Sequence, residues 1–335
     1  MLLEARGLGQ FDDASLIQAL ASPPLDAQTW CPMNSGLLDE YNQFYSLQFP
    51  GIDRDLALVE SNGERITIQT FAPNDREIQA WAVVCHGYYD HVGLYGHLIK
   101  DLLLRDIAVV TFDQPGHGLS SGDRANIGDF QQYVNVIEIV HKFASKRALT
   151  KPLHWVGQSM GGALVMEYWQ QQGDAKPTGE VVLLAPLVRP YAWPIMRWAF
   201  ALAKRTVQAR PRNMTSNMLN REFTNLLTVD PLQANVLPVA WVQAMIDWFT
   251  RFEKYPSCSL PVKIVQGYED RTVSFRHNLA VLNKQYSNAG IYIIPSARHH
   301  LVNESAAIYD ELWFWLDDVC DWHKVKSSSS SSSSS

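Results

Sequence analysis

Ser159 is the residue of this chain whose surroundings most clearly indicate chemistry, because it lies in a G-x-S-x-G pattern over residues 157–161. The apolar run just before the pattern, 153–156, is typical of a short buried strand, and the run after it is typical of a helix. A serine in a strand-turn-helix context with small flanking residues has its hydroxyl exposed above a sheet. We therefore predict that Ser159 is a nucleophile and that Gly157 and Gly161 permit the tight turn.

A serine hydroxyl needs a base to take its proton and an acid to orient that base. Both follow Ser159 in the chain, each just beyond a predicted strand. Asp270 follows the seventh predicted strand, and a histidine doublet, His299 and His300, follows the eighth. The order Ser, Asp, His and the positions at strand ends predict a proton relay.

Two assignments within this relay stay open at the level of sequence. Glu269 is an alternative acid, although Asp270 is better placed, four residues past the strand in a G-x-x-D turn. Only one of the adjacent histidines can face Ser159. The frame in which alanine and arginine precede and leucine follows favours His299 over His300.

An ester-cleaving serine also needs backbone N–H donors for the developing oxyanion, and losing one donor typically costs about a hundredfold in rate. One donor is expected from Met160, the residue after the nucleophile. The second is expected from the loop after the third predicted strand, which begins His86-Gly87. We predict that the N–H of Tyr88 is this donor and that His86 braces the loop.

The segment 112–120 follows the fourth predicted strand and is rich in turn residues. We expect it to border the same cleft, with Asp113 and His117 holding the loop in place. The remaining histidines show no spacing typical of metal ligands, so the sequence predicts no metal site.

Strand-like runs alternate with helical patterns from about residue 56 to 322, after a lead-in of about fifty residues that is irregular or helical. The predicted strands are 56–60, 66–71, 81–85, 107–112, 153–156, 181–184, 262–265 and 291–294. The predicted helices are 94–105, 130–146, 162–171, 276–286 and 306–322. This alternation predicts an α/β fold, an eight-stranded and mostly parallel sheet flanked by helices. The first two strands lack a helix between them and should form an antiparallel hairpin at one edge.

Residues 187–256 interrupt the alternation with helical segments broken by prolines, and we predict a helical cap inserted between the sixth and seventh strands. The cap carries nine basic and four acidic side chains, a net charge of +5, which leaves −11 for the rest of a chain whose total is −6. The core is expected to comprise 1–186 and 257–326. The serine run 327–335 is low-complexity, and we expect it to be disordered or artefactual.

Composition places the 335-residue chain among soluble globular proteins, with 47% hydrophobic and 19% charged residues. The mild net negative charge argues against nucleic acid as a partner. Four scattered cysteines favour a reduced, cytoplasmic setting, with Cys85 a buried thiol. We see no secretory signal and no stretch long enough to span a membrane.

Together these residues resemble the α/β-hydrolase superfamily, and more narrowly its monoacylglycerol lipase and bacterial lysophospholipase branch. The matching segments are 86–91 with Tyr95, 112–120, 157–162, 266–271 and 297–304. The resemblance implies a triad of Ser159, Asp270 and His299, no cofactor, and a cap built from the insertion. This chain has Tyr88 where the family often has a small residue, which would narrow the acyl entrance, and Gln158 where histidine is common.

We therefore expect a serine hydrolase that cleaves the ester of a single-chain lipid, a lysophospholipid or a monoacylglycerol. An aminopeptidase or amidase of the same fold is the alternative, although it would need acidic residues in the cap. A non-catalytic binding protein is disfavoured because all three triad members are present. The basic and aromatic segment 194–205 suits contact with an anionic lipid surface, or packing of its apolar residues onto the body with only the basic face solvated. The sequence indicates no oligomeric state.

Overall fold

The computed structural model describes residues 11–21, 29–31, 36–212 and 217–323. The serine run 327–335 lies outside the described residues. In chain order the elements are α1 (Asp13–Ala21), β1 (Thr29–Cys31), α2 (Gly36–Phe44), β2 (Ile52–Ser61), β3 (Glu64–Pro73), β4 (Ala80–Cys85), η1 (Val92–Tyr95), α3 (Gly96–Leu103), β5 (Ile107–Phe112), α4 (Phe130–Ala148), β6 (Leu153–Gln158), α5 (Met160–Gln171), β7 (Val181–Leu184), α6 (Trp193–Ala203), β8 (Ala209–Pro211), α7 (Arg221–Val229), β9 (Val236–Pro238), α8 (Val239–Phe252), β10 (Lys263–Gly267), α9 (Phe275–Gln285), β11 (Gly290–Ile294), η2 (Leu301–Asn303) and α10 (Ala306–Val319).

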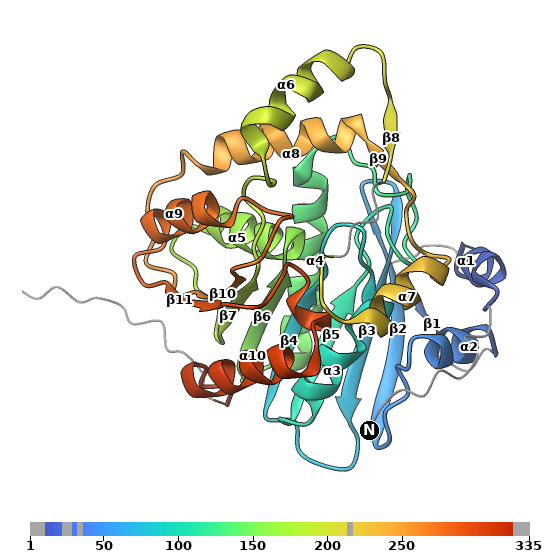
Figure 1. Ribbon diagram of the computed structural model, residues 1–335. Coiled ribbons are helices and arrows are strands. Elements are labelled where there is room, and N and C mark those ends of the chain that lie inside the picture. The colour runs from blue at the N-terminus through green and yellow to red at the C-terminus, as the bar shows by residue number, and fades with distance from the viewer. Residues whose placement is uncertain (1–10, 22–28, 32–35, 213–216, 324–335) are drawn as a thin grey trace, which may run out of the picture.

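Within these residues the central sheet has nine strands in the order β1-β2-β3-β5-β4-β6-β7-β10-β11 (Figure 1). The pairs from β1 to β5 are antiparallel, and those from β5 to β11 are parallel. The predicted α/β fold class is confirmed. The eight predicted strands correspond to β2–β7, β10 and β11, and the short strand β1 adds a ninth at the edge.

The antiparallel hairpin expected at one side of the sheet is formed by β2 and β3. Asn62 and Gly63 connect the two strands, with φ values of 52° and 83°. Two consecutive residues of positive φ make the type I′ turn whose twist matches that of the flanking strands. The turn pairs Ser61 with Glu64 and thereby sets the register of the whole hairpin.

Both faces of the sheet are covered, which explains why its parallel strands are apolar at nearly every position. In β4, Trp81, Val83 and Cys85 belong to the core shared with α4 and α5. The alternate residues Ala82 and Val84 belong to the core shared with α3 and α10. Successive side chains of a strand point to opposite faces, so a continuous apolar run is what a strand between two helical layers requires.

Between β7 and β10 the described residues form the predicted helical segments, as α6, α7 and α8, and also a two-stranded ribbon of β8 and β9 that pairs Arg210 with Leu237. The expectation of helices alone is therefore wrong at the ribbon. Prolines that interrupt the helical pattern lie at its ends, Pro211 and Pro238. Proline has no N–H to donate to a neighbouring strand, but it is tolerated at strand ends and edges. The two short segments can therefore pair with each other despite their prolines.

Helix α8 fastens this insertion to the core. The indole N–H of Trp248 donates to the buried carboxylate of Glu167 in α5 at 3.0 Å. The Trp248 ring also stacks on Phe130 of α4, with ring centroids 5.2 Å apart. Trp248 therefore anchors the helix in two ways, by the packing of its ring and by the hydrogen bond from its N–H to the carboxylate.

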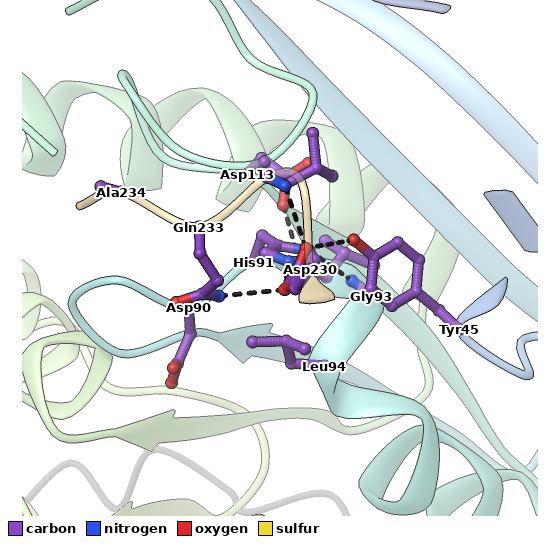
Figure 2. Close-up of polar contacts among 12 residues, drawn as sticks. Tyr45, Asp90, His91, Gly93, Leu94, Asp113, Asp230, Gln233 and Ala234 are labelled. Atoms are coloured by element: carbon purple, nitrogen blue, oxygen red, sulfur yellow. Dashed lines mark hydrogen bonds and ion pairs between the residues drawn. The ribbon is translucent and has the colours of Figure 1, made fainter. Parts of the chain in front are cut away.

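A second attachment joins the insertion to the 86–91 loop and the N-terminal lead-in, at Asp230 (Figure 2). The carboxylate of Asp230 accepts from Nε2 of His91 at 2.9 Å and from the hydroxyl of Tyr45 at 2.5 Å. The amide of Gln233 also points to this carboxylate, at 3.0 Å. The side chains of His91 and Asp230 are fully buried.

Burial and charge act in opposite directions on this pair. Burial raises the pKa of Asp230, but the attraction of His91 outweighs it and holds that pKa below 3.8. Burial lowers the pKa of His91, but Asp230 raises it above its ordinary 6.5. Asp230 thus contributes stability that is lost as pH falls through its lowered pKa, and His91 contributes stability that is lost as pH rises through its raised pKa. The pair should stabilise most between about pH 4 and 6.5.

The substitution Asp230→Asn should destabilise the protein by about 3 kcal/mol near pH 6, because a buried histidine loses its counter-charge. The cost should be smaller at a high pH, above the raised pKa of His91, where the imidazole is neutral in the folded state. Urea midpoints at both pH values measure it. The control is Glu138→Gln, which breaks the exposed ion pair with Lys142 and should cost less than about 0.5 kcal/mol. Equal losses for the two variants would contradict the assignment.

Candidate active site

Ser159 lies at the junction of β6 and α5 with φ of 52° and ψ of −113°. A non-glycine residue with such a backbone is strained, by about 1–3 kcal/mol, and persists only where its surroundings impose the geometry. Here the N–H of Ser159 donates to the carbonyl of Leu184 on β7 at 2.8 Å. The turn at Ser159 is therefore anchored on the neighbouring strand.

The glycines on either side of Ser159 are required by close backbone packing. A Cβ atom added to Gly157 would lie 2.7 Å from the backbone of Gly161. A Cβ atom added to Gly161 would lie 2.0 Å from the carbonyl oxygen of Cys85, at the end of β4. Both obstacles are backbone atoms that cannot turn aside, so the turn accepts only glycine at these two positions.

The structure brings Ser159, His299 and Asp270 into one series of hydrogen bonds. Nε2 of His299 lies 2.8 Å from Oγ of Ser159, and Nδ1 lies 2.7 Å from Oδ2 of Asp270. A carboxylate can only accept, so Nδ1 carries the proton and Nε2 is free to take one from the serine. The three residues are 9%, 4% and 2% exposed, respectively. This arrangement suits proton transfer from a nucleophilic hydroxyl.

Asp270 is held in its position by further donors. Its Oδ1 accepts from the N–H groups of Thr272 and Val273 at 2.7 and 3.0 Å, and its Oδ2 accepts from the amide of Gln266 at 2.9 Å. Burial raises the pKa of Asp270, but His299 and these hydrogen bonds outweigh burial and lower it. The neighbouring Glu269 is exposed. Between the two acids, Asp270 alone contacts a histidine.

The two adjacent histidines contact different residues. His299 faces Ser159, whereas Nε2 of His300 lies 3.0 Å from Oδ2 of Asp90, in the loop after β4. The amide of Gln158, the residue before Ser159, donates to the carbonyl of His299 at 2.9 Å. The residue at 158 thus holds the backbone of the histidine that contacts Ser159.

The loop after β4 lies directly against the serine. A Cβ atom added to Gly87 would be 3.4 Å from Cβ of Ser159. Nε2 of His86 accepts from the N–H of Gln114 at 2.9 Å, so Nδ1 carries the proton that is donated to the carbonyl of Gly87 at 2.7 Å. Burial lowers the pKa of His86, which fits a neutral brace. In the described part of the chain, the N–H groups of Tyr88 and Met160 donate to no acceptor.

Asp113 and His117 contact the loops that surround the site. Asp113 accepts from the N–H groups of Val92 and Leu119 at 2.7 and 2.8 Å. Nδ1 of His117 lies 2.9 Å from the carbonyl of Pro115, within its own loop. These contacts fit side chains that hold loops, as the sequence predicts.

Among the described residues, no group of histidine, cysteine and acidic side chains could hold a metal ion. None of the helices in the described ranges has the length and apolar character needed to cross a bilayer.

Comparison with known proteins gives a consistent result. Residues 76–306 match the family described as "Serine aminopeptidase, S33". Monoglyceride lipase of Mus musculus is 29% identical over 285 residues, which cover 80% of this chain and 90% of the relative. Monoacylglycerol lipase of Mycolicibacterium smegmatis is 26% identical over 274 residues, 78% of this chain and 93% of the relative.

The chain belongs to this α/β-hydrolase family, in its monoglyceride lipase branch. A soluble variant of monoglyceride lipase from Saccharomyces cerevisiae, solved with a substrate analogue, has the same fold, with a TM-score of 0.70. The similarity covers 84% of this chain and 98% of the yeast chain at 18% identity.

In this α/β-hydrolase, side chains of the insertion pack on the two tyrosines of the loop that lies against Ser159. The ring of Tyr88 stacks on Trp241 of α8, with centroids 3.6 Å apart and planes 15° apart. The Tyr88 hydroxyl donates to the carbonyl of Ala125 at 2.7 Å. The guanidinium of Arg212 lies 4.0 Å from the ring centroid of Tyr89. The two bulky residues of the loop thus bind the insertion to it.

Sequence reasoning gave no role to Gln266 or Asp230 of this hydrolase, although Gln266 begins one of the segments that match the family. Gln266 had a detectable signal, because it is a polar residue inside an otherwise apolar strand, next to the predicted acid. Asp230 had none, because it is one charge in a basic segment and contacts a histidine 139 positions away. Only the folded chain brings these two groups together.

The substitution Gly161→Ala should destabilise this hydrolase by about 3 kcal/mol and misplace Ser159, because the new methyl group would overlap the Cys85 carbonyl. Urea unfolding and the rate of reaction with a fluorophosphonate measure the two effects. The control is Gly128→Ala, where the added Cβ meets nothing within 4 Å. Normal stability and reactivity of Gly161→Ala would contradict the close approach.

Proposed function

We propose that this α/β-hydrolase is a serine carboxylester hydrolase that cleaves the acyl ester of a single-chain lipid, a monoacylglycerol or lysophospholipid. The observation that carries the proposal is the series of contacts from the Ser159 hydroxyl through His299 to the Asp270 carboxylate. It supplies a nucleophile, a base and an orienting acid in nearly buried surroundings, which is the arrangement that acyl transfer by serine requires.

In the proposed reaction, Oγ of Ser159 attacks the ester carbonyl carbon while Nε2 of His299 takes the hydroxyl proton. Asp270 stays ionised and stabilises the imidazolium that forms. His299 then gives the proton to the departing alcohol oxygen, which leaves an acyl-enzyme on Ser159. A water molecule that gives its proton to His299 attacks this acyl group, and the fatty acid is released as the proton returns to Ser159.

The negative charge on the carbonyl oxygen needs fixed donors during both attacks. We assign this role to the N–H groups of Met160 and Tyr88, because both lie beside Ser159 and donate to no other acceptor within the described ranges. Donors that are oriented before the reaction stabilise the oxyanion without reorganisation, and the removal of one typically costs about a hundredfold or more in rate.

Two features support a lipid substrate. The loop that lies against Ser159 carries Tyr88, whose ring stacks on Trp241 of the insertion, and apolar aromatic surroundings suit an acyl chain. The relatives named above are lipases that act on monoglycerides. We further infer that residues 187–256 act as a cap over this site.

The family description names an aminopeptidase, and such an enzyme needs acidic groups to hold the substrate ammonium. The insertion offers few. Asp230 is paired with His91, and Glu253 is paired with Arg189 and His277. With these carboxylates already paired and a net charge of +5 over the segment, the insertion favours an ester of a neutral or anionic lipid.

The substitution Ser159→Ala should abolish fluorophosphonate labelling and lower kcat by about 10⁴-fold or more, because the nucleophile is removed. Purified wild type and variant are compared on a monoacylglycerol, lysophosphatidylcholine, short p-nitrophenyl esters and amino-acid amides. The expected result for wild type is labelling and hydrolysis of the lipid esters. Absence of labelling would refute the serine mechanism. Labelling with cleavage of amides alone would favour an aminopeptidase.

Helix α6 lies at the outer side of the insertion (Figure 1), and several of its apolar side chains are exposed to solvent. Trp193 packs on Phe249 of α8, with ring centroids 5.1 Å apart, and fastens the start of the helix. Trp198 and Leu202 are 67% and 80% exposed, and Ile195 is also exposed. From residue 193 to 205 the charged side chains are all basic: Arg197, Lys204 and Arg205.

We propose that α6 docks on an anionic lipid surface, with the cytoplasmic leaflet of a membrane as its site in the cell. Exposed apolar side chains enter the interface, and basic side chains beside them are attracted to anionic headgroups. An enzyme held at the bilayer in this way would reach a substrate that is itself dissolved in the membrane.

The double variant Trp198→Gln, Leu202→Gln should bind vesicles that contain about one third phosphatidylglycerol at least tenfold more weakly than wild type, because its apolar face is lost. Cosedimentation measures the binding, and the hydrolysis of a soluble p-nitrophenyl ester should stay unchanged. The control is Phe314→Gln, a residue that is 81% exposed on α10, the helix that lies at the opposite end of the molecule from α6 (Figure 1). Unchanged binding of the double variant, or an equal loss with the control, would refute the docking surface.

A further inference from the structure

The loop that carries the Tyr88 N–H does not hold its own shape. Tyr89 has φ of 70°, in the left-handed region that a tyrosine adopts only with strain, about 1–2 kcal/mol. Inside the loop, the N–H of Asp90 donates to the carbonyl of Gly87 at 3.2 Å. This long backbone hydrogen bond and the contact of the His86 side chain with the same carbonyl are little compensation for that strain, so the loop also depends on contacts from outside.

The direction of the Tyr88 N–H follows from the atoms of Gly87. The carbonyl of Gly87 and the N–H of Tyr88 belong to the same planar peptide unit and point in opposite directions. Contacts that orient Gly87 therefore orient the donor. Nδ1 of His86 holds the Gly87 carbonyl at 2.7 Å, as described above. The remaining polar group of this residue, the Gly87 N–H, donates to the hydroxyl of Tyr95 at 2.9 Å.

Tyr95 lies in η1, is 1% exposed, and joins Gly87 to Asp90. Its hydroxyl accepts from Gly87 and donates to Oδ2 of Asp90 at 2.9 Å. Burial, together with the Asp90 charge, raises the pKa of Tyr95 well above its ordinary value, so the phenol keeps its proton. That single proton is directed to the carboxylate, which leaves the oxygen lone pair for the Gly87 N–H.

Asp90 extends these contacts to the histidine doublet. Its Oδ2 also accepts from Nε2 of His300 at 3.0 Å, and His300 follows the proposed base His299 directly. Burial raises the pKa of Asp90, but His300 and the other donors outweigh burial and hold it below its usual range. Asn303 donates to the carbonyl of Leu94 at 2.8 Å and so ties η2, next to the doublet, to η1.

We propose that Tyr95, supported by Asp90 and His300, is a positioning residue for the oxyanion donor Tyr88. The hydroxyl of Tyr95 fixes Gly87, and through Gly87 it aims the Tyr88 N–H at the place where the substrate oxygen becomes negative. Because His300 adjoins His299, the same contacts hold the Tyr88 N–H and the His299 imidazole in fixed positions relative to each other. This inference rests on the proposed serine mechanism and concerns residues outside the triad.

The test is Tyr95→Phe, which removes one oxygen atom from a buried ring. A donor aimed wrongly weakens transition-state binding alone, so kcat should fall about tenfold to a hundredfold while KM changes less than about twofold. The affinity for a trifluoromethyl ketone, which forms a tetrahedral adduct with Ser159, should fall in proportion to kcat/KM. The affinity for an unreactive ether analogue of the substrate should stay constant.

The matched control is Tyr168→Phe, which also removes a buried tyrosine hydroxyl, one that contacts His141 on α4 away from the site. It should leave kcat and ketone affinity unchanged. The second variant is Asp90→Asn, which keeps an acceptor for Tyr95 but weakens both hydrogen bonds, and its kcat should fall about threefold or more. If Tyr95→Phe fails to fold, Asp90→Asn decides by the same measurements.

A folded Tyr95→Phe with kcat within twofold of wild type, or with a loss confined to KM, would overturn the inference. A loss of activity without a matching loss of ketone affinity would also overturn it, because the effect would then lie outside the oxyanion. Wild type that neither reacts with a fluorophosphonate nor hydrolyses esters would instead refute the serine mechanism itself. The two failures are thus distinguishable.

Discussion

The backbone contact between the turn at Ser159 and the end of β4 sets the geometry of the whole site. Gly161 lies so close to the Cys85 carbonyl that no side chain fits between them. The turn carries the proposed nucleophile, and β4 leads directly into the loop with the Tyr88 N–H. Because rigid backbone joins rigid backbone here, nucleophile and donor are positioned relative to each other by packing that substrate binding cannot easily disturb.

Opposite this contact, two adjacent histidines serve different networks. His299 lies between Ser159 and Asp270, whereas His300 contacts Asp90, which Tyr95 links to Gly87. The side chains of these two neighbouring residues point in different directions, so one short segment after β11 can meet both Ser159 and the loop. Burial makes such networks demanding, because a polar group left without a partner there would cost about 1–3 kcal/mol.

The insertion is attached to the core on one side and exposes the helix α6 to solvent on the other. On the side toward the core, Asp230 is hydrogen-bonded to His91 and Trp248 to Glu167. Trp241 stacks on Tyr88. The outer helix α6 is instead apolar toward solvent. An element that is held firmly on one side and unpartnered on the other is suited to meet a surface. This division supports an enzyme that receives its substrate from a lipid phase.

Much of this arrangement could be predicted from the sequence. The strand runs, the hairpin, the place of the insertion and the order of Ser159, Asp270 and His299 follow from local periodicity and from the rule that strand ends meet at one edge of a parallel sheet. The sequence frame favoured His299 as the histidine that faces the serine, and the tertiary structure places it there. Only the tertiary structure decided that Asp90 pairs with His300 and that Asp230 reaches His91. These contacts join residues more than a hundred positions apart. Spacing along the chain carries no information on them, because they depend on how packed elements orient their side chains.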